Sequence, residues 1–397
     1  MSSLLDRIVG FFEWCWRFFT AQSITGSKYD PYRRSRVRWT FRIIIMIIVF
    51  IILFWLITLF WATGWVRGYS LAYPQSVIAP TELSQSGETT NITSGRVDVQ
   101  SCGRSELVHM TSHLTNEMIV TNGWIPSMPQ YKTGLLFITD WEKTPFFDNK
   151  ASFQLGILQS VRRTTIELVD SLGRIRGTSG EDSDLESARG NLNFDQRTWY
   201  INPFDPQRQT FSPSSSTGFY KEAVKSLDRF NQKLATYDEK DGRCGALFDT
   251  RADNLRQLLV RISSHLGGVV DQLSKRSQGE RYDPRLDEFV AGEGNNAGWF
   301  DFQADNYFYE ASGVMYAYHG LLQAARVDFA DVIEKRDLDD IWDLMETHIA
   351  EAAALSPVIV SNGKEDGVLF PDHLSALSEN MLRSRSNMVE IRDILTQ

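Results

Sequence analysis

The sequence lacks the short motifs that mark common catalytic and nucleotide-binding sites. It contains no GxSxG nucleophile elbow, no phosphate-binding P-loop and no dinucleotide-binding glycine fingerprint. Of its six histidines only His109 and His113 are spaced to face one metal from a helix, and they lack the glutamate of an HExxH zinc-protease motif. We interpret them as a surface pair, and predict no catalytic residue, no cofactor and no metal site.

Charged residues are missing from one long stretch, residues 43–66, which reads IIIMIIVFIILFWLITLFWATGWV. At about 1.5 Å per residue this run reaches roughly 36 Å, enough to cross a hydrocarbon core of about 30 Å. Arg42 and Arg67 close the run, and Trp61 and Trp65 lie in its second half, where indole rings favour the membrane surface. We predict a transmembrane helix over 43–66, with membrane lipid as a partner and these four side chains at the interface.

The flanks of this run differ in charge, which predicts its orientation. Residues 1–42 carry eight basic and three acidic side chains, whereas residues 67–397 carry 33 basic and 47 acidic ones. Because Lys and Arg near a span stay on the cytoplasmic side, we expect the N-terminus inside and residues 67–397 outside. The run lies too far from the N-terminus, and is too long, for a cleaved signal peptide, so we predict an uncleaved signal-anchor.

Residues 1–42 combine an amphipathic segment with a basic juxtamembrane segment. Phe12, Trp16 and Phe19 follow helical spacing on the apolar face of the first segment. This helix could lie in the inner-leaflet interface or pack against a partner subunit. The basic residues that follow favour attraction to anionic lipid headgroups, and we predict no nucleic-acid partner.

Beyond the span, residues 67–102 are rich in Ser, Thr, Pro and Gly and predict a linker. From residue 103 onward, apolar residues recur at three- and four-residue steps, and short strands could form at 134–139 or 358–360. We therefore predict an all-α fold, with a helical bundle over 103–397. Three of these apolar stripes are Leu107, Met110, Leu114 and Met118; Leu255, Leu259, Ile262, Leu266, Val269 and Leu273; and Leu374, Leu377, Met381, Met388, Ile391 and Leu395, the last of which is interrupted at Ser384.

Cysteine is scarce, and the predicted topology separates its three copies. Cys15 precedes the span, and Cys102 and Cys244 are the two that follow it. Disulfides persist outside the cytoplasm, so Cys102 and Cys244 are candidates for a bridge, which would stabilise by up to roughly 5 kcal/mol. The alternative is two unpaired, buried cysteines.

Acidic residues occur in pairs that could serve glycoside or peptidoglycan cleavage, a reaction that needs two carboxylates. In a chain this acidic, solvated helix faces are the simpler interpretation. The pairs are Glu181/Asp182, Asp283/Asp287, Asp339/Asp343 and Glu365/Asp366.

Several short motifs together resemble the proteobacterial envelope family known as domain of unknown function 2333. They are Phe153–Arg163, Asn193–Asp195 with Trp199, Arg251–Leu255, Phe308–Ala311 and Pro357–Val360. The resemblance runs from about Thr121 to the C-terminus and includes the anchor, with an apparent insertion at 141–150 and a departure at 176–184. It implies a Gram-negative inner-membrane protein that faces the periplasm, and it transfers no activity. We interpret its signature residues as structural: Arg251, Asp253, Asn254, Tyr309 and Glu310.

Two functions of different class remain open. The first is a scaffold or accessory subunit, either a homo-oligomer or part of a larger envelope complex. The second is a periplasmic cell-wall hydrolase that uses paired carboxylates. A sensor is a weaker third interpretation, because some forty cytoplasmic residues leave no room for an output domain.

Overall fold

The computed structural model describes most of the chain as two compact units, residues 1–62 and 63–397. The described residues are 31–78, 102–135, 138–144, 146–173, 180–200, 214–238, 243–278, 280–283, 286–291, 301, 303–363 and 371–396.

The first unit contains the long apolar helix α2 (Pro31–Leu59). By length and composition, the stretch Phe41–Gly64 is long and apolar enough to cross a membrane. The prediction of one apolar helix of spanning length is confirmed. Arg42 lies in α2, Trp61 in the π-turn η1 (Phe60–Gly64), and Trp65 and Arg67 follow it. Phe12, Trp16 and Phe19 lie outside the described residues.

The second unit is a bundle of long helices, which confirms the predicted all-α fold. Its long helices are α4 (Glu106–Asn116), α6 (Asn149–Glu167), α7 (Ser183–Leu192), α8 (Ser216–Ala235), α9 (Ala252–Ser277), α10 (Ala304–Asp328), α12 (Asp339–Ala354) and α13 (His373–Ile394). Its shorter elements are α3 (Tyr73–Val77), η3 (Glu117–Thr121), α5 (Gln130–Thr133), η4 (Trp141–Lys143), η5 (Leu168–Leu172) and α11 (Ala330–Lys335).

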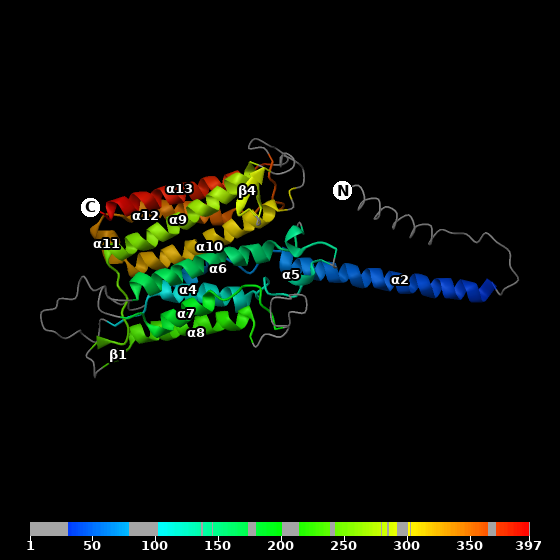
Figure 1. Cartoon of the computed structure of the whole chain (residues 1–397), viewed down its shortest axis with the longest axis horizontal. Coiled ribbons are helices and arrows are strands. Elements are labelled where there is room, and N and C mark those ends of the chain that lie inside the picture. The colour runs from blue at the N-terminus through cyan, green and yellow to red at the C-terminus, as the bar shows by residue number, and fades with distance from the viewer. Residues whose placement is uncertain are drawn as a thin grey trace. The chain divides into compact units, whose positions relative to one another are not determined.

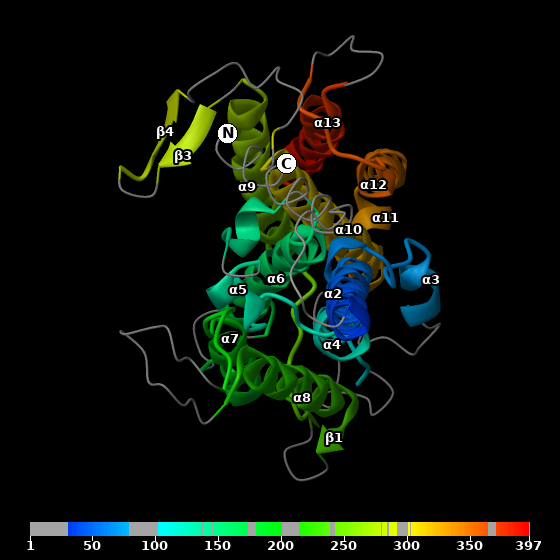
Figure 2. The same cartoon turned by 90° about the vertical axis from the view of Figure 1, so that its right-hand side faces the viewer.

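Helices α4, α6 and α10 form the middle of this unit (Figures 1 and 2). The pair α7 and α8 packs on one side of them, and α9, α12 and α13 pack on the other. Helix α10 contacts α4, α6, α9, α12 and α13, so nearly all of its faces are covered. Its residues are accordingly apolar or small around most of the circumference.

The apolar stripes predicted on α4, α9 and α13 face this core. Each of their members is buried, from Leu107 on α4 to Leu395 after α13. Ser384, the polar residue in the last stripe, is also buried, and its hydroxyl donates to the carbonyl of Asn380, 2.9 Å away. Periodicity therefore identified the buried face of these helices correctly.

Two glycines allow α6 and α10 to pack closely. A β-carbon at Gly156 of α6 would overlap the carbonyl oxygen of Glu310, and one at Gly313 of α10 would overlap the carbonyl oxygen of Phe153. The two helix backbones therefore touch where both helices lack a side chain. This contact sets the spacing at the centre of the bundle.

The segment after the apolar helix differs from the predicted linker. Residues 69–78 include α3, and Tyr73 is only 5% exposed because its ring is packed inside the bundle.

The observed strands differ from the predicted ones. Within 134–139, Leu135 and Thr139 form a single bridge, and two short hairpins lie elsewhere in the chain. They are β1 (Tyr237–Asp238) with β2 (Arg243–Cys244), and β3 (Glu280–Asp283) with β4 (Glu288–Ala291). Strands this short carry too little alternation to be read from sequence.

Candidate functional site

A cluster of buried aromatic and polar side chains joins the segment after the apolar helix to the bundle. We call Tyr69, Tyr73, Glu117, Gln154 and Tyr316 the tyrosine cluster. The rings of Tyr73 and Tyr316 stack with centroids 4.6 Å apart, and the ring of Tyr69 meets that of Tyr316 edge-on at 5.5 Å. Aromatic pairs in these geometries stabilise by about 0.5–1.5 kcal/mol beyond their burial.

Hydrogen bonds satisfy the polar atoms of this cluster. The Tyr73 hydroxyl donates to the carbonyl of Tyr316 (2.8 Å), and the Tyr316 hydroxyl donates to the Glu117 carboxylate (3.0 Å). The Gln154 amide donates to the Tyr69 hydroxyl (3.1 Å) and to the carbonyl of Gly123 (2.7 Å). Residues more than 200 positions apart are thus held in one network, which fixes the chain at residues 69–73 against α6 and α10.

Glu117 is the member of the cluster that titrates near neutral pH. Burial raises the pKa of its carboxyl to about 7, and the hydrogen bond from Tyr316 opposes that shift. Burial also raises the pKa of Tyr69, Tyr73 and Tyr316 far above the usual tyrosine value, so all three stay neutral. The charge inside the cluster therefore depends on Glu117 alone.

The histidine pair predicted at the surface divides between two environments. His109 lies 3.6 Å from the Glu106 carboxylate, and this hydrogen-bonding partner raises the pKa of the imidazole. The ring of His113 instead stacks on Tyr73 at 5.9 Å, and burial lowers its pKa. Within the described part of the chain, no three His, Cys, Asp or Glu side chains are grouped to hold a metal ion.

His265 has a structural role at the centre of the bundle. Its Nδ1 lies 2.7 Å from the Tyr318 hydroxyl, and its Nε2 lies 3.2 Å from Oε1 of Gln159. Burial lowers the pKa of this imidazole to about 3, so the ring is neutral. The side chain connects α9 to α6 and α10 rather than facing a ligand.

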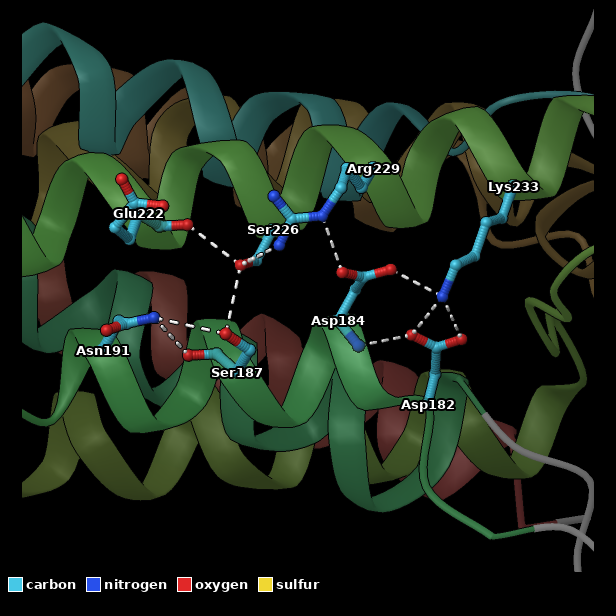
Figure 3. A network of polar contacts seen from close by, with 8 residues as sticks. All are labelled: Asp182, Asp184, Ser187, Asn191, Glu222, Ser226, Arg229 and Lys233. Atoms are coloured by element: carbon cyan, nitrogen blue, oxygen red, sulfur yellow. Dashed lines mark hydrogen bonds and ion pairs between the residues drawn. The ribbon is translucent and has the colours of Figure 1, made fainter.

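Asp182, one member of the first acidic pair predicted from sequence, belongs to a polar network between α7 and α8 (Figure 3). Asp182 accepts a hydrogen bond from the amide of Asp184 at the start of α7, and its carboxylate lies 3.1 Å from Nζ of Lys233. Asp184 pairs with Arg229 at 2.8 Å. Glu181 lies 3.8 Å from Arg189. Each of these carboxylates has a cationic partner, which is a structural arrangement.

Of the other predicted pairs, Asp339/Asp343 is the one whose two side chains both belong to the described part of the chain. Asp339 and Asp343 both pair with Arg326, at the junction of α10 and α12. Asp283 lies in β3, and Asp287 lies in the following turn with a positive φ of 53°. Glu365 and Asp366 lie outside the described residues.

Two other carboxyl groups are buried near one another, and sequence reasoning missed them. Asp148, before α6, is fully buried and Asp305, in α10, is 5% exposed. Both oxygens of Asp148 and one of Asp305 have no hydrogen-bond partner among the described residues. Burial raises the pKa of Asp148 to about 8 and, together with Asp148, that of Asp305 to about 9. No local pattern links positions so far apart in the sequence. A polysaccharide cannot reach groups this deeply buried, so they give the hydrolase interpretation no support.

The signature residues support two junctions of the fold. Arg251 pairs with Asp249 at 2.6 Å and lies 4.0 Å from Asp253, while Asn254 donates to the carbonyl of Asp249, so the three organise the start of α9. Glu310 accepts a hydrogen bond from Gln159 between α6 and α10. The Tyr309 ring meets that of Phe308 edge-on at 5.5 Å, and burial raises its pKa to about 12.

Cys102 and Cys244 are joined by a disulfide, with their Cα atoms 5.7 Å apart. It links the chain just before α4 to strand β2, which follows α8. The bridge spans 142 positions in the sequence, so it restrains a long loop of the unfolded chain.

Comparison with known proteins identifies a family without assigning an activity. No curated protein and no solved structure matches the chain. The family match covers residues 141–397, so it begins later than the expected Thr121, leaves out the anchor and includes the supposed insertion at 141–150. Because this match covers well over half of the sequence, the chain belongs to the DUF2333 family, described as uncharacterised proteins conserved in bacteria.

Proposed function

We propose that this protein is a single-pass inner-membrane scaffold whose helical domain lies in the periplasm. In this role it acts as an accessory subunit of an envelope complex, or assembles with further copies of itself. The tyrosine cluster is the observation that supports this proposal most directly. It holds residues 69–73 inside the bundle, so only a few residues separate the folded domain from the apolar helix along the sequence.

The proposed orientation rests on charge and on the disulfide. The basic flank precedes the apolar helix and the acidic bulk of the chain follows it, which favours a cytoplasmic N-terminus. The Cys102–Cys244 bridge suits an oxidising compartment such as the bacterial periplasm. Protease added to spheroplasts should digest the helical domain, and cells should yield a faster-migrating chain on non-reducing gels that Cys102→Ser abolishes. Protection of the domain from protease would contradict this orientation.

The scaffold role is tested by extracting the protein from its native membranes into nanodiscs and measuring particle mass. We expect a defined particle heavier than one chain in its disc. Tyr73→Ala should release residues 69–73 from the bundle and so reduce that mass. The helical domain would then be joined to the membrane helix by a longer flexible segment, and we expect it to assemble with its partner less tightly. Tyr200→Ala is the matched control, since Tyr200 is 49% exposed.

Circular dichroism and the disulfide mobility shift show whether each variant keeps its folded domain. A wild-type particle that contains a single chain would contradict the scaffold role. An assembly that a folded Tyr73→Ala variant retains in full would contradict the part assigned to the tyrosine cluster.

A further inference from the structure

A groove of about 420 Å³ lies between α6 and α9, on the surface of the bundle. Three arginines line it, one from α6 and two from α9, and we call it the arginine groove. Its polar lining is Arg163, Glu167, Arg256, Gln257, Arg261 and Ser264. A pocket of a few hundred Å³ accommodates a small molecule or a headgroup rather than a protein segment.

The three arginines differ in their partners. Arg261 pairs with Glu167 at 2.6 Å and with Asp170 at 3.3 Å, so its charge is balanced within the fold. Neither Arg163 nor Arg256 has an ion pair or a side-chain hydrogen bond with any residue that the structure describes. The groove therefore holds two uncompensated positive charges in a chain whose net charge is −9.

We infer that the arginine groove binds a phosphate group that carries two negative charges. The planar guanidinium matches phosphate oxygens through paired N–H donors, and two arginines balance one dianion. Uncharged donors are also present. Gln257 uses its carbonyl oxygen to accept from Ser171 at 2.9 Å, which leaves its amide N–H groups to donate, and the Ser264 hydroxyl lines the same groove.

The chemistry fits a phosphomonoester, either in a soluble compound or in a lipid headgroup. The inference does not depend on the scaffold role, because it follows from the groove and its charges alone. It is tested on the full chain in detergent by calorimetric titration with inorganic phosphate in Tris buffer. Acetate serves as the monoanionic comparison, and vesicles of phosphatidylcholine with and without phosphatidic acid represent the lipid source.

The test variant is the double substitution Arg163→Gln and Arg256→Gln. Arg336→Gln is the control, because Arg336 is exposed, as Arg163 is, and has no side-chain partner among the described residues but lies after α11, outside the groove. We expect saturable binding of phosphate that is tighter than that of acetate, at least tenfold weaker in the double variant, and unchanged in Arg336→Gln.

Each outcome decides the inference. Phosphate binding that needs both arginines supports it with a soluble source, and vesicle binding that needs them together with phosphatidic acid supports it with a lipid source. Absence of binding by both probes would overturn it. Equal losses in the double variant and in Arg336→Gln would overturn it too, because they would reflect general charge attraction.

Discussion

Helix α6 meets α10 and α9 through two interfaces of opposite character. Toward α10 the backbones touch at Gly156 and Gly313, and the neighbouring polar groups of the tyrosine cluster are hydrogen-bonded. Toward α9 the helices leave an open groove, in which Arg163 and Arg256 have no partner among the described residues. The first interface has no space for another molecule, and the second does.

This difference separates residues that hold the fold from residues that are free to bind. A close-packed interface loses stability with any added atom, because interiors pack at crystal-like density. Exposed side chains around a groove contribute little to the stability of the fold, so stability does not account for the presence of charged residues there. The comparison therefore predicts that substitutions at the α6–α10 interface change the stability of the protein more than substitutions at the α6–α9 groove.

Gly313→Ala should have the largest effect. Its β-carbon would overlap the backbone carbonyl of Phe153, and backbone cannot rotate away as a side chain does. We expect a loss of more than about 3 kcal/mol in the free energy of unfolding. Chemical denaturation of the full chain in detergent, followed by circular dichroism, measures it.

The control for this substitution is Gly268→Ala on α9, where an added β-carbon meets no atom within 4 Å. In an open helical position alanine should stabilise by up to about 1 kcal/mol. Equal effects of the two substitutions would show that close approach of α6 and α10 does not hold the bundle together.

Arg261→Gln should have the next largest effect on stability. It distinguishes the arginine of the groove that supports the fold from the arginines that we propose bind phosphate. The substitution leaves the Glu167 carboxylate, whose side chain is 1% exposed, without its cation. We expect a loss of about 2–3 kcal/mol, less than for a fully buried pair because Arg261 is partly solvated. Denaturation measures it against Arg163→Gln, which should change stability little. If Arg163→Gln lost as much free energy of unfolding as Arg261→Gln, this distinction between the two arginines would be wrong.

Glu117→Gln, in the tyrosine cluster beside the α6–α10 interface, should stabilise the folded protein by an amount that depends on pH. The carboxyl has a pKa of about 7 in the folded protein and a usual value of 4.5, so the folded state holds its proton more tightly. Its contribution to stability is complete below pH 4.5 and is lost as the pH rises through 7. The neutral amide avoids this loss and still accepts from Tyr316, so we expect a gain of about 1–2 kcal/mol at pH 8 and none at pH 4.5.

Thermal melts at the two pH values measure this effect. Glu351→Gln on α12 removes an acidic charge at an exposed position and serves as the control. A gain of the same size at pH 4.5 and at pH 8 would show that titration of Glu117 is not its cause.

The helices were predictable because their information is local. The three- and four-residue steps of Leu255–Leu273 indicated the buried face of α9, and the uncharged run of 43–66 identified the apolar helix. The two cysteines that follow that helix were the natural candidates for the bridge. Each of these predictions needed only spacing, composition or a count.

The tyrosine cluster was not predictable, because its parts lie far apart in the chain. Tyr69 and Tyr73 lie in a segment whose composition is that of a linker, and their partner Tyr316 follows more than 240 positions later. The arginines of the groove come from two helices in the same way. Spacing along one helix reports which residues face inward, but it does not report which residue of another helix they meet.

The double variant Arg163→Gln and Arg256→Gln should have the smallest effect on folding, and it gives the sharpest test of the comparison. Neither side chain has a partner to lose among the residues that the structure describes, so without phosphate we expect stability within about 0.5 kcal/mol of wild type. Added phosphate should raise the melting temperature of the wild type alone, because a ligand stabilises the state that binds it. Melting scans with and without inorganic phosphate measure both effects. If the variant were strongly destabilised without phosphate, these arginines would belong with Arg261 as supports of the fold, and the α9 side of α6 would be no freer than the α10 side.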